Sequence, residues 1–222
     1  MIRDAALVAG KDLRIEARSR VTINQVAPFA VLVLVLFAFA LEPDRGLLTR
    51  AAAGLFWLAV TFSALLAIQR SFAIESADGA RDGLRLSGLD PAGIFLGKAG
   101  AVAVELLALE VLLGAGVVLL YDVELGGAVL LATTCLAATL GLAAAGTVYG
   151  VLAAGVRVRE TLLPLLLLPV VAPVVLAATR ATEAALGQSA ADGWSWVRLL
   201  GAFAVIYAAV GAVAFGPLLE DS

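Results

Sequence analysis

The sequence predicts an all-α, polytopic membrane protein with six transmembrane helices. Six apolar runs, divided by short charged breaks, fill more than half of the 222 residues. Hydrophobic residues make up 62% of the chain, compared with ~45–50% in soluble domains, and its mean hydropathy is +1.03. Each run can cross a hydrocarbon core of ~30 Å as a helix. No run alternates apolar and polar positions as barrel strands do, and amides in lipid must bond internally, so helices are predicted.

The predicted spans form one membrane domain over residues 1–222, in which residues 1–22 precede a bundle of residues 23–219. The spans cover residues 23–41, 51–68, 99–120, 128–154, 162–178 and 199–219.

Residues 1–22 are predicted to form an interfacial helix. At ~100° per residue, apolar side chains share one side and basic side chains the opposite one. The two sets are Ile2, Ala5, Ala6, Ala9, Leu13 and Ala17, against Arg3, Lys11, Arg14 and Arg18. A basic face suits anionic headgroups. The alternative is a solvated charge cluster that only follows the preference of cytoplasmic segments for Lys and Arg.

The distribution of basic residues predicts the orientation in the membrane. With the N-terminus inside, eleven of the fifteen Lys and Arg fall in cytoplasmic segments, and only four fall outside: Arg45, Arg50, Arg180 and Arg198. Short cytoplasmic loops collect Lys and Arg. Both termini are therefore expected in the cytoplasm.

The longest break between spans, residues 69–98, is predicted to be cytoplasmic. Asp78-Gly79 and Asp90-Pro91 are turn signals, and a short amphipathic helix is expected over about residues 78–87. The charged residues of this loop are Glu75, Asp78, Arg81, Asp82 and Arg85. Such a helix has the right form to dock into a groove on a soluble partner, and a solvated connector is the alternative.

The chain lacks the residues for a nucleotide or metal site. Gly93 and Gly97 have three residues between them and Lys98 precedes an alanine, whereas a Walker loop has four residues there and a Ser or Thr after its lysine. There is no His, one Met and one Cys, Cys135. The usual ligands of haem iron and zinc are therefore missing. Any ATPase must be a separate chain, and no bound cofactor is expected.

Two carboxyl groups lie in the third predicted span, and Glu110 falls near its midplane, where a charge costs at least ~3 kcal/mol. Glu105 and Glu110 diverge by ~140° around a helix, too far to act as a paired acid and base. Each is expected to face protein or water. Glu110 is either a functional group or a protonated acid that is hydrogen bonded to a neighbouring helix.

Small residues and prolines mark the fourth and fifth spans. Gly146 and Gly150 form a GxxxG pair that suits close helix packing, within or between subunits. Pro164, Pro169 and Pro173 remove three amide donors, so they predict a kink or break in a helix that avoids lipid.

The stretch LPLLLLPVVAPVVLAAT, residues 163–179, resembles the signature of the cytochrome c maturation haem exporter protein B (CcmB) family. The stretch GLFWLAVTFSALLAIQRSFAIESADG, residues 54–79, resembles that family's second span and the loop that follows. Its matching residues are Gly54, Trp57, Ser63, Leu65, Leu66, Arg70, Phe72, Asp78 and Gly79. The six-span plan, the interfacial N-terminal helix and the length agree, so the resemblance covers essentially the whole chain.

The resemblance implies a non-catalytic ABC-2 type permease subunit in the inner membrane. It implies that a CcmA-like ATPase hydrolyses ATP, and that this hydrolysis releases haem-loaded chaperone during cytochrome c maturation. The loop of Glu75 to Asp90 would couple the two subunits. The other implied partners are a second copy of the chain, a CcmC-like haem-handling protein, a small CcmD-like peptide and membrane lipid, with no nucleic acid. Haem is the implied cargo, and its passage through this chain stays open.

Two other hypotheses remain open from the residues alone. An ABC-2 permease could export another substrate, such as a drug or a glycolipid. A proton-coupled secondary transporter could use Glu105 and Glu110, although no inverted repeat is visible.

Overall fold

The computed structural model describes residues 1–20, 22–41, 45–76, 88–123, 126–154 and 159–221. Within these ranges the chain is helical, with short turns and no strand. Its elements are α1 (Ile2–Ser19), the π-helix η1 (Thr22–Val26), α2 (Ala27–Ala40), α3 (Arg45–Ser76), α5 (Pro91–Tyr121), α6 (Ala128–Ala154), α7 (Arg159–Ala185) and α8 (Gly193–Asp221). The all-α fold is confirmed.

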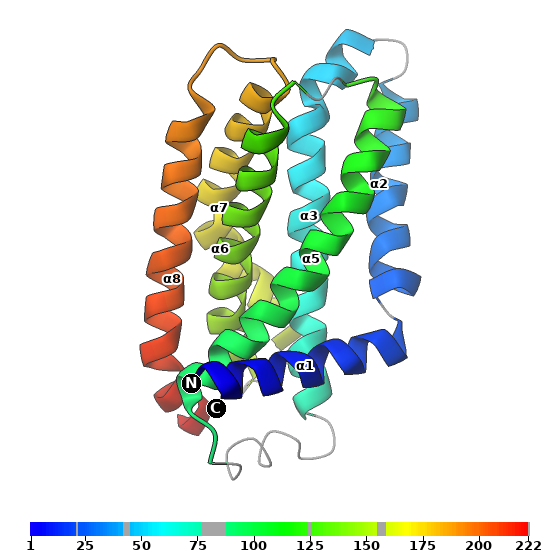
Figure 1. Ribbon diagram of the computed structural model, residues 1–222. Helices are drawn as coiled ribbons and strands as arrows, with labels where there is room; N and C mark the ends of the chain where they lie inside the picture. The colour runs from blue at the N-terminus through cyan, green and yellow to red at the C-terminus, as the bar shows by residue number, and fades with distance from the viewer. Residues whose placement is uncertain (21, 42–44, 77–87, 124–125, 155–158, 222) are drawn as a thin grey trace.

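Six helical segments in the described chain are long and apolar enough to cross a membrane, as predicted. They are Thr22–Ala40, Gly46–Ala73, Pro91–Tyr121, Ala128–Ala154, Thr161–Ala185 and Gly193–Leu219. The protein is therefore a multi-pass membrane protein. In Figure 1 the six segments stand side by side as a bundle, and α1 lies across one end, where both termini are also found.

α5 begins eight residues before the predicted third span. Asp90 caps this helix, because its side chain accepts a 3.1 Å hydrogen bond from the backbone N–H of Ala92. Pro91 occupies the first helical position, where its missing N–H has no consequence. The Asp90-Pro91 pair therefore starts a helix rather than a turn, and Lys98 lies inside that helix.

α3 is the central helix of the bundle. It is the most buried of the six spans, whereas α2 and α8 are the least buried. Trp57, in the middle of α3, is fully buried, and its Nε1 donates a 2.8 Å hydrogen bond to Thr182 Oγ1 of α7. α3 therefore contacts α2, α5, α6 and α7.

α7 runs as one helix through Pro164, Pro169 and Pro173, so the break that the sequence allowed does not occur. Pro169 and Pro173 are exposed on the outer face of this single chain. Each proline lacks the N–H that would bond the carbonyl four residues earlier. In a membrane, such carbonyls are satisfied by neighbouring helices, side chains, water or local changes in helix geometry.

Candidate functional site

A cluster of charged and polar side chains joins α1 to α3 and α5, and we call it the α1 junction. Its members are Asp12, Glu16, Arg70, Ser71, Lys98 and Glu105. Arg70 Nε of α3 donates a hydrogen bond to Glu16 Oε2 of α1 at 3.2 Å. Lys98 Nζ of α5 lies 3.4 Å from Asp12 Oδ2 of α1. Two ion pairs thus hold α1 against two of the membrane-spanning helices, α3 and α5.

Lys98 is the most enclosed charge of the α1 junction, with a side chain only 1% exposed. Besides its ion pair with Asp12, it donates a 3.2 Å hydrogen bond to Ser71 Oγ, and its ammonium lies 4.8 Å from the centre of the Phe72 ring. A buried charge is tolerated only when it is paired and hydrogen bonded. Lys98 meets this condition through contacts with α1 and α3.

Glu16 stays ionised at neutral pH. Burial disfavours its charged form and would raise its pKa, but the hydrogen bond from the backbone N–H of Thr22, at 2.6 Å, and the nearby Arg70 guanidinium outweigh burial. The pKa of Glu16 is therefore lowered from its usual 4.5. Its charge pairs with Arg70 and fixes the start of η1 through Thr22.

Two glycines let α5 cross α1 closely. A Cβ atom on Gly93 would lie 2.8 Å from Asp4 Cβ, and a Cβ atom on Gly97 would lie 2.6 Å from the carbonyl oxygen of Ala5. Both distances are shorter than real Cβ contacts allow. The spacing that superficially resembles a phosphate loop is therefore a small-residue packing surface for α1.

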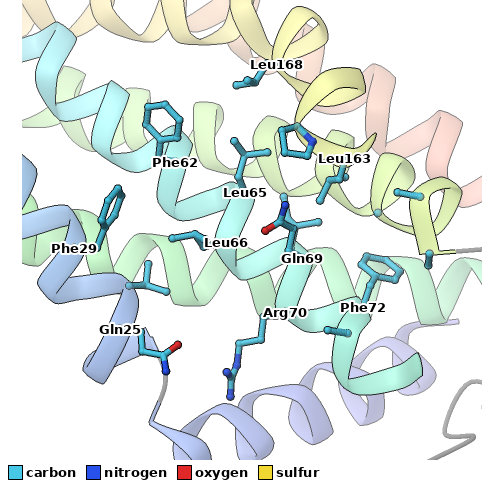
Figure 2. A pocket seen from close by; sticks show the side chains of 17 residues that line it. Gln25, Phe29, Phe62, Leu65, Leu66, Gln69, Arg70, Phe72, Leu163 and Leu168 are labelled. Atoms are coloured by element: carbon cyan, nitrogen blue, oxygen red, sulfur yellow. The ribbon is translucent and has the colours of Figure 1, made fainter. Parts of the chain in front are cut away.

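A lateral cleft of about 740 Å³ lies beside the α1 junction, and Figure 2 shows it from close by. η1, α2, α3, α6 and α7 contribute its lining, which is mainly apolar. Gln25, Gln69 and Arg70 are the polar lining residues, and Arg70 extends toward α1. Neither Met1 nor Cys135 lines the cleft, and the chain has no His. The cleft therefore suits an apolar or amphipathic occupant and offers no usual ligand to haem iron.

Glu105 and Glu110 lie in different surroundings, because their side chains leave α5 in directions that differ by ~140°. Glu105 is half-buried and lines a small cavity of the α1 junction together with Asp12 and Arg70. Glu110 is 4% exposed and accepts a hydrogen bond from Thr139 Oγ1 of α6. The first carboxyl group belongs to the charged end of the bundle and the second belongs to its interior.

Gly146 and Gly150 bring α6 against α3 within one chain. A Cβ atom on Gly146 would collide with Ile68, and a Cβ atom on Gly150 would collide with Phe72. Phe72 therefore touches both α6 and Lys98 of α5. The GxxxG pair positions the α3 segment that carries Arg70, Ser71 and Phe72.

Comparison with known proteins identifies the family. The family model described as CcmB protein matches residues 3–222. The chain belongs to the CcmB family. A protein of Haemophilus influenzae named "Heme exporter protein B" is 32% identical over 207 residues, which cover 93% of this chain and 90% of that relative. A protein of the same name from Paracoccus denitrificans is 29% identical over 189 residues, covering 82% and 83% of the two chains.

Most of the ATPase-coupling residues that the CcmB resemblance implies lie outside the described residues. Asp78, Gly79, Arg81, Asp82 and Arg85 lie outside the described residues, as does the helix expected at residues 78–87. Glu75 is in the last turn of α3. α3 ends and α5 begins at the end of the bundle that α1 crosses. Both ends of the predicted coupling loop are thus placed beside the α1 junction.

The sequence of this CcmB family member did not lead us to predict that Asp12 and Glu16 would pair with Lys98 and Arg70. The helical projection of residues 1–22 considered only apolar and basic positions, whereas Asp12 and Glu16, one turn apart, face the bundle. Two observations could have predicted these ion pairs. Asp12 and Glu16 are one helical turn apart, and Arg70 and Lys98 lie near the ends of two apolar runs. Val8, which is buried one turn before Asp12, extends the same face.

Proposed function

We propose that this CcmB family member is the membrane subunit of an ABC transporter complex for haem export in cytochrome c maturation. The match over residues 3–222 carries this proposal, because relatives similar over most of the chain are named "Heme exporter protein B". The six apolar helices supply the membrane part. The sequence has no Walker motif, so ATP would be hydrolysed by a separate, CcmA-like subunit.

The ATPase subunit would bind the loop that contains Glu75, Asp78, Gly79, Arg81, Asp82 and Arg85. This loop connects α3 to α5, and both helices are tied to α1 by the ion pairs of Arg70 and Lys98. A force on the loop would therefore act on α1, α3 and α5 together. This arrangement supports a role for the α1 junction in transmitting ATP-driven movement to the bundle.

A second copy of the chain would cover the exposed face of α7 and the neighbouring lateral cleft. Pro169 and Pro173 are exposed there, together with Leu165 and Leu176, which are 65% and 56% exposed. A protein partner can shield the carbonyls that the prolines leave without a donor, whereas lipid cannot. The apolar lining of the cleft supports the same arrangement.

Haem would be the cargo of the complex and not a cofactor of this chain. The chain has no His, and its single Met and Cys do not line the cleft. A CcmC-like membrane protein and a small CcmD-like peptide would handle haem, and ATP hydrolysis would release the haem-loaded chaperone. The complex would sit in the inner membrane with both termini of this chain in the cytoplasm.

Affinity purification of the full chain in mild detergent tests the proposal. We expect a CcmA-like ATPase and a CcmC-like protein to co-purify, and cytochrome c maturation to fail when the gene is deleted. Purification with an ATPase but with a different membrane partner and normal cytochrome c maturation would contradict the haem assignment and leave only the ABC permease architecture.

A further inference from the structure

Glu110 has one satisfied and one unsatisfied carboxyl oxygen. Oε1 accepts the hydrogen bond from Thr139 Oγ1, while Oε2 has no hydrogen-bond partner among the described residues. The residue is only 4% exposed. Buried polar atoms in proteins nearly always have a partner, either a protein group or ordered water. The size of the space beside Oε2 and the polar groups that line it indicate which partner this oxygen can bind.

Glu110 lines a cavity of about 70 Å³ inside the bundle. The other lining residues come from α3, α5, α6 and the end of α7: Ala52, Ala53, Phe56, Gly114, Val117, Val118, Val123, Leu131, Cys135, Thr182 and Leu186. Val123 and Leu186 follow the ends of α5 and α7 at the end of the bundle opposite α1. One water molecule occupies ~30 Å³ of liquid, so the cavity has room for about two. It extends from Glu110 toward the side of the membrane away from α1.

The cavity also offers polar partners to water. Thr182 Oγ1 accepts the hydrogen bond from Trp57 Nε1 at 2.8 Å, which leaves the hydroxyl hydrogen of Thr182 available for another acceptor. The Cys135 thiol, a weak donor on the cavity wall, interacts with the Glu110 carboxyl group itself. A buried water needs two to four polar partners. Glu110 Oε2 and the Thr182 hydroxyl meet that number.

The cavity offers no positive charge to an ionised Glu110. Of the described residues that line it, Cys135 is the only other titratable group. Lys98, on the same helix, is twelve residues or ~18 Å away and is paired with Asp12. Arg50 and Arg180 are exposed at the far end of the bundle, and Arg180 is paired with Glu183 at 2.9 Å. Without a counter-ion, a carboxylate at this depth is strongly disfavoured.

We propose that Glu110 and this cavity form a hydrated site, in which Glu110 keeps its proton and binds water that enters from the end of the bundle opposite α1. The neutral acid can donate from Oε2 to water while Oε1 accepts from Thr139. Water would then connect α5 to Thr182 of α7, and through Trp57 to α3. The site goes beyond the proposed transport function and does not depend on the identity of the cargo.

The proposal predicts a protonated carboxylic acid that exchanges its proton with water. In the purified full chain in detergent at neutral pH, infrared spectroscopy should show the carbonyl stretching band of a protonated carboxylic acid, and transfer to D₂O should shift this band because the acid's proton exchanges through the bound water. Glu110→Gln should remove a component of the band that Glu105→Gln leaves in place. A spectrum that Glu110→Gln leaves unchanged in folded protein would overturn the proposal.

A matched pair of glycine variants tests the cavity. Gly114 lines the cavity and a Cβ atom there would meet no other atom within 4 Å, so a larger side chain in Gly114→Leu should occupy part of the cavity. Gly100 is on the same helix, has the same open surroundings and does not line the cavity. Gly114→Leu should slow deuterium exchange of the Glu110 carbonyl band severalfold, while Gly100→Leu should leave the exchange rate unchanged. Equal exchange rates in Gly114→Leu and in the parent protein would show that water does not reach Glu110 through this cavity.

Discussion

Arg70 and Glu16 are 54 residues apart in the sequence, and their side chains form an ion pair of 3.2 Å between α3 and α1. Lys98 and Asp12 repeat the arrangement between α5 and α1 at 3.4 Å. α1 is therefore a fixed part of the bundle rather than a helix that merely rests on lipid. Its attachment is at the end of the bundle where the proposed ATPase-binding loop begins and ends.

The first prediction concerns the Glu16 charge. Because the pKa of Glu16 is lowered in the folded protein, its contribution to stability is complete above the unfolded pKa of 4.5 and is lost as the pH falls through the lower folded value. At neutral pH, Glu16→Gln should lower the free energy of unfolding by ~1–3 kcal/mol, since Arg70 loses its partner. The difference from the parent protein should shrink as the solution is acidified below pH 4.5.

Unfolding of the purified protein in detergent, measured at neutral and acidic pH, checks this prediction. Arg18→Gln is the matched control, because Arg18 is exposed on the same helix. A loss of stability in Glu16→Gln that is the same at both pH values would show that packing, and not charge, explains the effect.

The second prediction concerns the packing of α6 on α3. Gly150→Leu should destabilise the protein by ~1–3 kcal/mol or more, because its side chain would collide with Phe72. Phe72 lies under the Lys98 ammonium, so the variant should also disturb the α1 junction. Gly100→Leu, with open space around its Cβ position, should be tolerated. Equal melting temperatures of the two variants in detergent would contradict the packing role of Gly150.

The sequence predicted the six spans well, because a transmembrane helix is specified by local hydropathy over ~20 residues. The start of α5 was predicted eight residues late. The prediction followed hydropathy and took Asp90-Pro91 as a turn, whereas Asp90 caps the helix and Lys98 is accommodated inside it by Asp12 and Ser71. The partners that make Lys98 acceptable lie 86 and 27 residues away, so local reasoning could not supply them.

The candidate site was predicted less completely. The GxxxG pair of α6 was recognised from its spacing, but the similar Gly93 and Gly97 were considered only as a failed nucleotide loop and not as a packing surface. Glu110 was expected to face protein or water and it is buried in the bundle, while Thr139 as its partner depends on how α6 rotates against α5. Such pairings follow from tertiary packing, which the periodicity of one helix does not determine.

The third prediction concerns orientation. Under the predicted topology, eleven of the fifteen Lys and Arg fall in the N-terminal segment and the loops on the same side as the termini, so that side should be cytoplasmic. Reporter fusions after Ser87 and Ser222 should be active in the cytoplasm, and a fusion after Ala190 should be active outside it. An external signal from the Ser87 fusion would reverse the proposed topology.

The fourth prediction concerns the coupling loop. Charge reversal at Asp78 and Arg81 together should weaken association of the ATPase, because the proposed contact surface would present the opposite charges. Insertion into the membrane should be unchanged, since both residues fall in the predicted loop between the second and third spans. Co-purification of the ATPase and the rate of ATP hydrolysis are the measurements. If both stay at the parent level, α1 or residues 156–160 must carry the contact instead.

The last prediction separates the shape of Glu110 from its ability to ionise. Glu110→Gln keeps a carbonyl oxygen to accept from Thr139 and an N–H to donate toward the cavity, so the variant should fold, assemble and support cytochrome c maturation. Glu110→Leu removes the acceptor and leaves the Thr139 hydroxyl without this partner in the core, which should lower the free energy of unfolding by ~1–3 kcal/mol.

Melting temperature in detergent and a maturation assay together distinguish the two roles of Glu110. A neutral acid that only holds water and Thr139 is replaced adequately by an amide, so both measurements should remain near the parent values in Glu110→Gln. An assembled Glu110→Gln complex that is inactive in maturation would show that the site must release its proton during the cycle. Glu110 would then take part in the mechanism, and its place between α5 and α6 would make the packing of these two helices sensitive to its charge.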